Sequence, residues 1–212
     1  MSSTQGTKRA EILAAATERF GRDGYEDTKW ADIAADVGVG PTALYHYFES
    51  KQHCVYVIME QALESFGTRF ADITAAGDDP VQTLIAVIDD VFDVDDHDVQ
   101  RIRVLVAEQG LLAGPSGSPR EEEARVAARA RTRELELAWA AFLSDAMERG
   151  AIPQSDPRLM TRAILGLYNS IWHWYRPNGL VALDRVAAFF TDRSLAMLGV
   201  TPEAAGRAQA AA

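Results

Sequence analysis

The residues of this sequence that could bind a partner chemically lie between positions 28 and 51. Residues 28–48 read TKWADIAADVGVGPTALYHYF, with apolar side chains recurring three and four positions apart. Between them stand hydroxyl, phenol, imidazole and ammonium groups, which can hydrogen-bond phosphate oxygens or the edges of bases. The outward-facing set is Gly40, Pro41, Thr42, Ala43, Tyr45, His46, Tyr47 and Lys51. The pattern indicates a contact surface with groups suited to nucleic acid, although a tyrosine-histidine-tyrosine run by itself more often packs on neighbouring helices.

A helix-turn-helix accounts for the apolar positions that must hold this surface in place. Ile33 and Ala34 would form the inner side of the first helix, and Ala34 is small enough for a close helix crossing. Gly38 can take the left-handed conformation that ends a helix. Leu44 and Phe48 are four residues apart, so they would hold the second helix against the first.

The side-chain types of the outward-facing set predict different contacts with DNA. Gly40 and Pro41 would let the N-terminus of the second helix, with its free amide donors, approach DNA closely. Thr42 can bond a base edge or touch a thymine methyl group, and Ala43 can make an apolar contact. Phosphate contacts are expected from Tyr45 and Lys51.

Residues 8–51 closely resemble the DNA-binding domain of the TetR family of repressors. The positions that carry the resemblance are Lys8, Arg9, Ile12, Ala16, Phe20, Gly24, Thr28, Ile33, Ala34, Gly38, Val39, Leu44, Tyr45, His46, Tyr47, Phe48 and Lys51. The resemblance implies a three-helix domain whose third helix enters the major groove. It also implies that a helical ligand-binding and dimerisation domain follows.

The same resemblance implies residue roles. Thr28 and Lys29 would contact phosphates. The base-proximal set would be Pro41, Thr42, Ala43, His46 and Tyr47, with Tyr45 and Lys51 on the DNA backbone. Gly40 stands where the family often has serine or threonine, and Pro41 where lysine or arginine is frequent. Since neither has a side-chain donor, specificity is expected to rest on Thr42, His46, Tyr47 and close backbone approach.

Helical periodicity also runs through the rest of the chain, and no segment alternates as a half-buried strand would. We therefore expect an all-α fold of about nine helices. The expected helices cover residues 8–22, 28–36, 42–48, 51–75, 80–93, 99–112, 119–149, 157–176 and 183–198. The expected division is a helix-turn-helix domain over 1–51, a ligand-binding and dimerisation domain over 52–200, and a disordered tail over 201–212.

Composition narrows the class of protein. The net charge of −10 argues at first against a nucleic-acid partner, but all three lysines lie within the first 51 residues. A single cysteine, Cys54, allows no intrachain disulfide and suits a reducing compartment. No apolar run is long enough for a membrane helix, and no signal peptide is recognisable, so a cytoplasmic location without a membrane partner is expected.

The most unusual feature of the second half is its aromatic concentration, since residues 168–176 read YNSIWHWYR. Aromatic side chains at helical spacing commonly form a core or a dimer interface. Alternatively, part of the cluster lines an apolar effector site with a few polar groups. That candidate site comprises Phe66, Phe70, Phe92, Trp139, Phe142, Tyr168, Asn169 and Trp172.

A second resemblance concerns the effector. Residues 165–190 look like the C-terminal part of TetR-type regulators of fatty-acid and steroid catabolism, which sense acyl-coenzyme A thioesters. The resemblance implies an effector of that kind, for which Arg101, Arg103 and Arg176 are candidate phosphate partners.

Other chemistry is not expected. The acidic run at residues 89–98 lacks the glycine and glutamate that a calcium loop requires, so a metal site is not predicted. No nucleophile elbow, phosphate loop or paired-histidine motif occurs, so neither an enzyme nor a cofactor is expected.

The predicted function is a ligand-responsive repressor that binds a pseudo-palindromic operator as a homodimer. In the family model the last two helices pair with their symmetry mates, which sets two recognition helices about 34–36 Å apart. Two alternatives stay open: an enzyme with an accessory helix-turn-helix, and an architectural DNA-binding protein without an effector.

Overall fold

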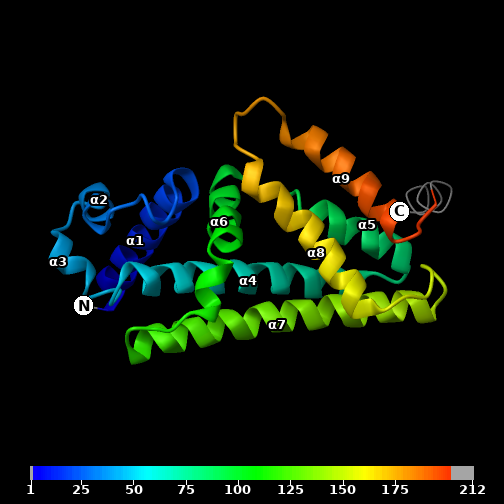
Figure 1. Ribbon diagram of the computed structural model, residues 1–212, viewed down its shortest axis with the longest axis horizontal. Helices are drawn as coiled ribbons and strands as arrows, with labels where there is room; N and C mark the ends of the chain where they lie inside the picture. Colours follow the sequence, from blue (N-terminus) through cyan, green and yellow to red (C-terminus); the bar gives the residue numbers. More distant parts are fainter. Residues whose placement is uncertain (1, 202–212) are drawn as a thin grey trace. The chain divides into compact units, whose positions relative to one another are not determined.

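The structure is a computed structural model that describes residues 2–201 (Figure 1). Its elements in chain order are α1 (Ser2–Asp23), α2 (Trp30–Asp36), α3 (Pro41–Leu44), α4 (Lys51–Ala76), α5 (Pro80–Asp90), α6 (Asp96–Ala107), the 3₁₀ helix η1 (Gln109–Ala113), α7 (Pro119–Glu148), α8 (Pro157–Trp174) and α9 (Leu183–Met197). No strand occurs between residues 2 and 201, so the predicted all-α class is confirmed. Of the predicted tail, all but Thr201 lies outside the described residues.

Helices α5 and α8 begin at their predicted residues, each with an aspartate cap followed by a proline. The Asp79 carboxylate accepts from the backbone N–H of Gln82 at 2.8 Å, and Pro80 occupies the first turn of α5. The Asp156 carboxylate likewise accepts from the N–H groups of Arg158 and Leu159 before α8. Proline suits the first turn because its missing N–H would have no intrahelical partner there.

Several predicted helix ends were wrong. Helix α1 begins at Ser2 instead of Lys8, and α2 begins at Trp30 instead of Thr28. Helix α8 stops at Trp174 because Tyr175 is extended, two residues before Pro177. The other corrected ends are those of α5, at Asp90, and of the segment predicted as 99–112, which divides into α6 and η1.

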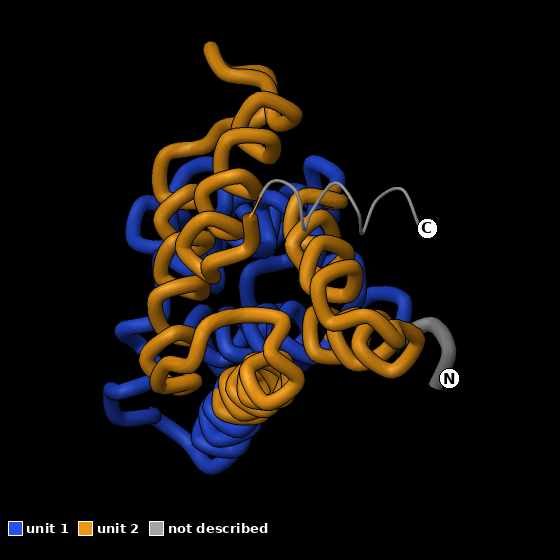
Figure 2. The backbone as a smooth tube through the Cα atoms, turned by 90° about the vertical axis from the view of Figure 1, so that its right-hand side faces the viewer, with its two compact units in different colours: residues 1–64, 95–132 blue, residues 65–94, 133–212 orange. Residues whose placement is uncertain are grey.

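The chain forms two compact units, coloured separately in Figure 2. The first contains residues 1–64 and 95–132, that is α1 to α3, the first part of α4, α6, η1 and the first part of α7. In it α1 crosses α6 closely, and Arg103 Nε donates to the carbonyl oxygen of Gly21 at 2.7 Å. Every candidate DNA-binding residue lies in this unit.

In the described part of the chain, the second unit contains residues 65–94 and 133–201. Within it α5 packs on α9, and α8 buries Ile164, Tyr168, Ile171 and Trp172. Every candidate effector-site residue lies in this unit. In the described part of the chain, no helix has both the length and the apolar composition of a membrane span.

Candidate DNA-binding surface and effector site

The turn between α2 and α3 has the geometry that the sequence predicts. Gly38 has a φ of 68°, in the left-handed region that favours glycine. Its N–H donates to Ala35 O at 3.2 Å, and the N–H of Val39 donates to Ala34 O at 2.9 Å. These two bonds form the Schellman arrangement that ends a helix.

The segment after Gly40 carries most of the exposed candidates. Helix α3 ends at Leu44, not at Phe48, and the next N–H groups of Tyr45, His46 and Tyr47 bond to carbonyls three residues back. Leu44 and Phe48 are fully buried, so they anchor both ends of this segment. The exposed candidates are Gly40, Pro41, Thr42, Tyr45 and His46, while Ala43 and Tyr47 are half-buried.

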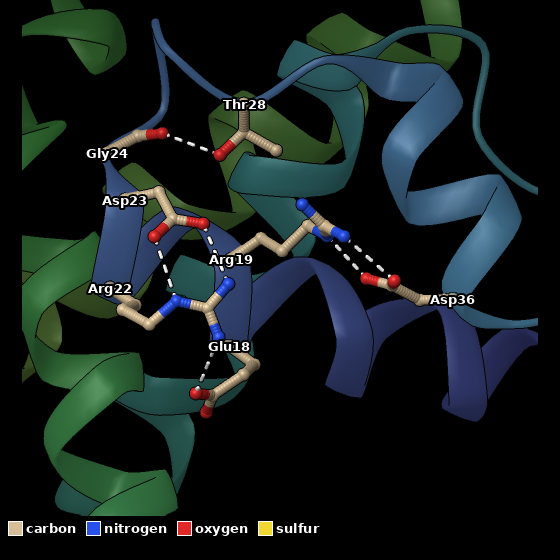
Figure 3. A network of polar contacts seen from close by, with 7 residues as sticks. All are labelled: Glu18, Arg19, Arg22, Asp23, Gly24, Thr28 and Asp36. Carbon is tan, nitrogen blue, oxygen red and sulfur yellow. Dashed lines mark hydrogen bonds and ion pairs between the residues drawn. The ribbon is translucent and has the colours of Figure 1, made fainter.

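A bidentate ion pair ties α1 to the end of α2 (Figure 3). Arg19 meets the Asp36 carboxylate with both Nε and Nη2, the latter at 2.8 Å. The Arg19 guanidinium therefore lowers the pKa of Asp36. Beside it, Lys8 Nζ donates to Val37 O at 3.3 Å. Since Asp36 and Val37 precede the turn at Gly38, these contacts fix where α3 begins.

Thr28 and Lys29 have different surroundings. The Thr28 hydroxyl donates to Gly24 O at 2.7 Å, as Figure 3 shows, and the side chain is buried. Its hydroxyl therefore stabilises the turn between α1 and α2. Lys29 is exposed at the N-cap position of α2, where its side chain makes no capping bond. Of the two side chains, only that of Lys29 is exposed.

Lys51 turns inward. Its Nζ donates to Tyr25 O at 2.5 Å and to Thr28 O at 3.0 Å, and it lies 4.0 Å from the centroid of the Tyr25 ring. One ammonium group thus joins the first turn of α4 to the segment between α1 and α2. The structure gives Lys51 these structural contacts, and its expected phosphate contact stays a prediction.

The first turns of α4 and α7 cap one another. Ser50 Oγ accepts from the N–H of His53 at 2.9 Å and donates to the Glu121 carboxylate at 2.7 Å. In return, Ser118 Oγ accepts from the N–H of Glu121 at 3.2 Å and donates to the Glu49 carboxylate. We call these four hydrogen bonds the reciprocal caps. Two of them pair N–H groups that helix starts leave without a partner, and the other two join the two helix starts.

His53 makes this junction sensitive to pH. Its Nδ1 accepts from the N–H of Glu49 at 3.2 Å, and the side chain is buried. Burial lowers the pKa of His53 from its ordinary 6.5, Arg120 and Arg9 lower it further, and the carboxylates of Glu49 and Glu121 oppose the shift. Protonation would also convert the accepting nitrogen into a donor.

The free energy of unfolding is therefore expected to fall as the pH drops below about 6.5, the ordinary pKa of histidine. Below that pH the unfolded chain binds the His53 proton more readily than the folded chain does, so acid favours unfolding. Stability from this source is complete above that pH. Urea unfolding of wild type and His53→Gln between pH 5 and 8 checks this, and identical pH slopes in both proteins would contradict it.

The candidate effector-site residues form two aromatic groups within the second unit. Phe92 packs edge-on against Tyr168 at 6.0 Å between ring centroids and lies 6.5 Å from Trp172. Phe70 lies 5.0 Å from Trp139 and 6.0 Å from Phe142. The two remaining candidates differ, since Phe66 lies beneath the Arg69 guanidinium and Asn169 is half-buried.

The structure adds a residue to the candidate effector site. Tyr175, which shares a helical stripe with Tyr168 and Ile171, is buried and extends the first group, at 5.9 Å from Trp172. By contrast, no sequence signal pairs Arg19 with Asp36 or Ser50 with Glu121, because such partners depend on the tertiary fold. Among the arginines considered for phosphate, Arg101 pairs with Asp98 and Arg103 bonds Gly21 O.

Helices α8 and α9 also present apolar side chains to solvent. The exposed large ones on these helices are Leu159, Trp174, Phe189 and Met197. On α8, the exposed positions Ala163, Gly166 and Ser170 lie between Leu159 and Trp174 at helical spacing. Their small side chains leave room for another helix to approach closely.

Comparison with known proteins identifies two family domains. Residues 12–56 match the model described as "Bacterial regulatory proteins, tetR family", and residues 77–198 match "Tetracyclin repressor-like, C-terminal domain". The HTH-type transcriptional repressor KstR2 of Mycobacterium tuberculosis is 26% identical over 199 residues, covering 93% of this chain and 94% of that protein.

Solved structures show the same fold. The ketosteroid transcriptional regulator KstR2 of Mycobacterium tuberculosis aligns with a TM-score of 0.71 and 25% identity, covering 89% of this chain and 93% of the other. AibR in complex with isovaleryl coenzyme A and operator DNA aligns with a TM-score of 0.73 and 22% identity, covering 88% and 97%.

Proposed function

Because the chain belongs to the TetR family of bacterial transcriptional regulators, we propose that it is a ligand-responsive repressor that binds a pseudo-palindromic operator as a homodimer. A small hydrophobic or acyl-coenzyme A-like effector would release it. We place it in the cytoplasm, where its DNA lies, and assign it no catalytic role. The domain division at residue 51 and the roles of individual site residues are parts of this proposal.

The observation that carries the proposal is the surface around α3. Buried Leu44 and Phe48 hold a short segment against α2, while Thr42, Tyr45 and His46 are exposed on it. The Gly38 turn, together with the Arg19–Asp36 pair, sets the direction in which this segment projects. A segment that is rigidly anchored and rich in base-reading groups is what a major groove can accept.

The effector part of the proposal rests on the aromatic groups of the second unit. They are apolar with few polar atoms, as sites for hydrophobic metabolites are. AibR has been solved with isovaleryl coenzyme A, which gives this fold a precedent for an acyl thioester ligand. The candidates remain Phe66, Phe70, Phe92, Trp139, Phe142, Tyr168, Asn169 and Trp172.

Dimerisation is proposed through α8 and α9. Leu159, Trp174, Phe189 and Met197 would be covered by the same residues of a second copy. Burying such side chains is favourable, by roughly 25 cal/mol for each Å² of apolar surface removed from water. A second copy also supplies the second recognition segment that a two-fold symmetric operator needs.

Selection of bound sequences from random DNA tests the proposal directly. The enriched sequences should be pseudo-palindromes with half-sites about 10–10.5 base pairs apart, or a multiple of that spacing. Repeating the selection with acyl-coenzyme A thioesters and the corresponding free acids identifies releasing ligands. Recovery of DNA without sequence preference would favour the architectural alternative, and turnover of a bound thioester would favour the enzyme alternative.

Thr42→Val should change which base is preferred at one operator position, with a discrimination of about 1–3 kcal/mol, because it removes one hydroxyl near the base edges. Lys29→Ala should weaken binding to all sequences alike and reduce the slope of log affinity against log salt by about 0.9. Fluorescence anisotropy over a series of operators and salt concentrations measures both. A uniform loss from both variants would contradict the assignment.

A further inference from the structure

Tyr168 carries a buried hydroxyl that the fold leaves without a partner. The residue is 3% exposed, and its ring lies edge-on to Phe92 in the first aromatic group. Among the described residues, no group forms a hydrogen bond with its hydroxyl. Removing such a group from water without a compensating bond is unfavourable, so an isolated hydroxyl here calls for an explanation.

Neighbouring polar groups do not provide that partner. Ser194 is close enough to the Tyr168 hydroxyl to lower its pKa, and Ser194 Oγ, which donates to Phe190 O at 2.7 Å, has lone pairs left to accept. Even so, no group in the described part of the chain, Ser194 included, meets the Tyr168 hydroxyl at hydrogen-bonding distance and angle. The carboxylate of Asp89 raises the pKa of Tyr168 through its charge alone.

Another buried tyrosine shows what a satisfied hydroxyl looks like in this fold. Tyr56 is fully buried in the first unit, and its hydroxyl donates to Leu111 O at 3.0 Å. The same oxygen accepts from Gln52 Nε2 at 2.6 Å. The Tyr56 hydroxyl therefore has hydrogen-bond partners in the fold, whereas the Tyr168 hydroxyl has none within the described residues.

The surroundings of Tyr168 indicate which chemical class of ligand could accept a hydrogen bond from its hydroxyl. Burial raises the pKa of Tyr168 to about 12, so the group is protonated and can donate at neutral pH. Its ring neighbour is apolar, and the nearby Asp89 carboxylate disfavours a second anion. A neutral carbonyl attached to an apolar chain fits these conditions better than a free carboxylate does.

We propose that the Tyr168 hydroxyl donates a hydrogen bond to the carbonyl oxygen of an acyl thioester effector whose apolar chain packs against Phe92 and Trp172. This rests on the effector part of the proposed function. It adds which atom of the ligand is recognised, and it predicts that thioesters are preferred over the corresponding free acids and over thioethers.

The test combines a protein change with a ligand change. Octanoyl-coenzyme A and S-octyl-coenzyme A differ in the thioester carbonyl, and their binding to the full-length protein is measured by calorimetry. Wild type should bind the thioester about tenfold more tightly than the thioether, a factor that corresponds to 1.4 kcal/mol. In Tyr168→Phe both ligands should bind with the lower affinity. Octanoate should bind wild type more weakly than the thioester.

A matched control separates recognition from folding. Tyr168→Phe should unfold at the same temperature as wild type or higher, because it removes a polar group that has no partner. Tyr56→Phe removes a bonded hydroxyl, so it should unfold at a lower temperature and keep the tenfold ratio between the affinities for thioester and thioether.

Two outcomes would overturn this inference. If the tenfold ratio persists in Tyr168→Phe, the inference is wrong but the proposed function is not affected. If wild type binds operator but no octanoyl-coenzyme A, the thioester effector fails and the inference fails with it.

Discussion

Gly21→Ala is expected to lower the free energy of unfolding by about 3 kcal/mol and to weaken operator binding. A Cβ at this position would lie 2.7 Å from both the carbonyl oxygen and the Cβ of Gln100. Neither atom can move without its backbone, so α1 and α6 would have to separate, which also lengthens the bond from Arg103 to Gly21 O. Overpacking of a close contact typically costs about 1–3 kcal/mol, and backbone contacts place this variant at the upper end.

Gly67→Ala is the matched control. Gly67 also lies within a helix, α4, but a Cβ there would meet nothing within 4 Å. This change should raise stability by about 0.5–1 kcal/mol, because alanine has the higher helix propensity. Urea denaturation followed by circular dichroism measures both variants. Equal effects of the two would show that helix propensity, and not the α1–α6 crossing, decides the outcome.

Lys51→Met is expected to have the second large effect, a loss of roughly 2–4 kcal/mol in the free energy of unfolding together with weaker operator binding. The change keeps the aliphatic length but removes the charge that holds Tyr25 O, Thr28 O and the Tyr25 ring. Hydrogen bonds from charged donors contribute about 1.5–3 kcal/mol each, and a cation–π contact about 0.5–2 kcal/mol. Because Lys51 is only half-buried, solvent screening places the net loss below their sum.

Salt dependence separates this structural role from a phosphate contact. If Lys51 mainly positions the α1–α2 segment, the remaining folded fraction of Lys51→Met should bind operator with an unchanged salt slope. Lys29→Met serves as the comparison, since Lys29 is exposed at the N-cap of α2. It should leave unfolding nearly unaffected and reduce the slope. Stability like that of wild type in Lys51→Met, with a reduced slope, would restore the phosphate contact.

Local signals predicted most of the fold. Apolar periodicity indicated the helices, and the acid-proline pairs at 79–80 and 156–157 indicated where α5 and α8 begin. Gly38 indicated the turn of the helix-turn-helix. Each of these signals acts within a few residues, so the local structure that it determines can be predicted from the sequence alone.

Predictions were wrong or stayed untested where a residue's environment depends on residues far away in the sequence. The phosphate contact expected of Lys51 stays a prediction, and its structural contacts could not be predicted, because only the fold brings the carbonyls of Tyr25 and Thr28 to its ammonium group. The end of α3 was set too late, since periodicity carries on through Phe48 whereas the backbone tightens after Leu44. The absence of a partner for the Tyr168 hydroxyl likewise depends on how α8 packs.

The reciprocal caps also limit how the gene can be divided. Ser50 and Ser118 stand far apart in the sequence, yet each hydroxyl donates to a carboxylate beside the other helix start. A fragment that ends at residue 64 would lose Glu121, and the first turn of α4 would lose a bond with it. A chimera in which the DNA-binding domain comes from another protein must therefore take residues 49, 50, 118 and 121 together from the same parent protein.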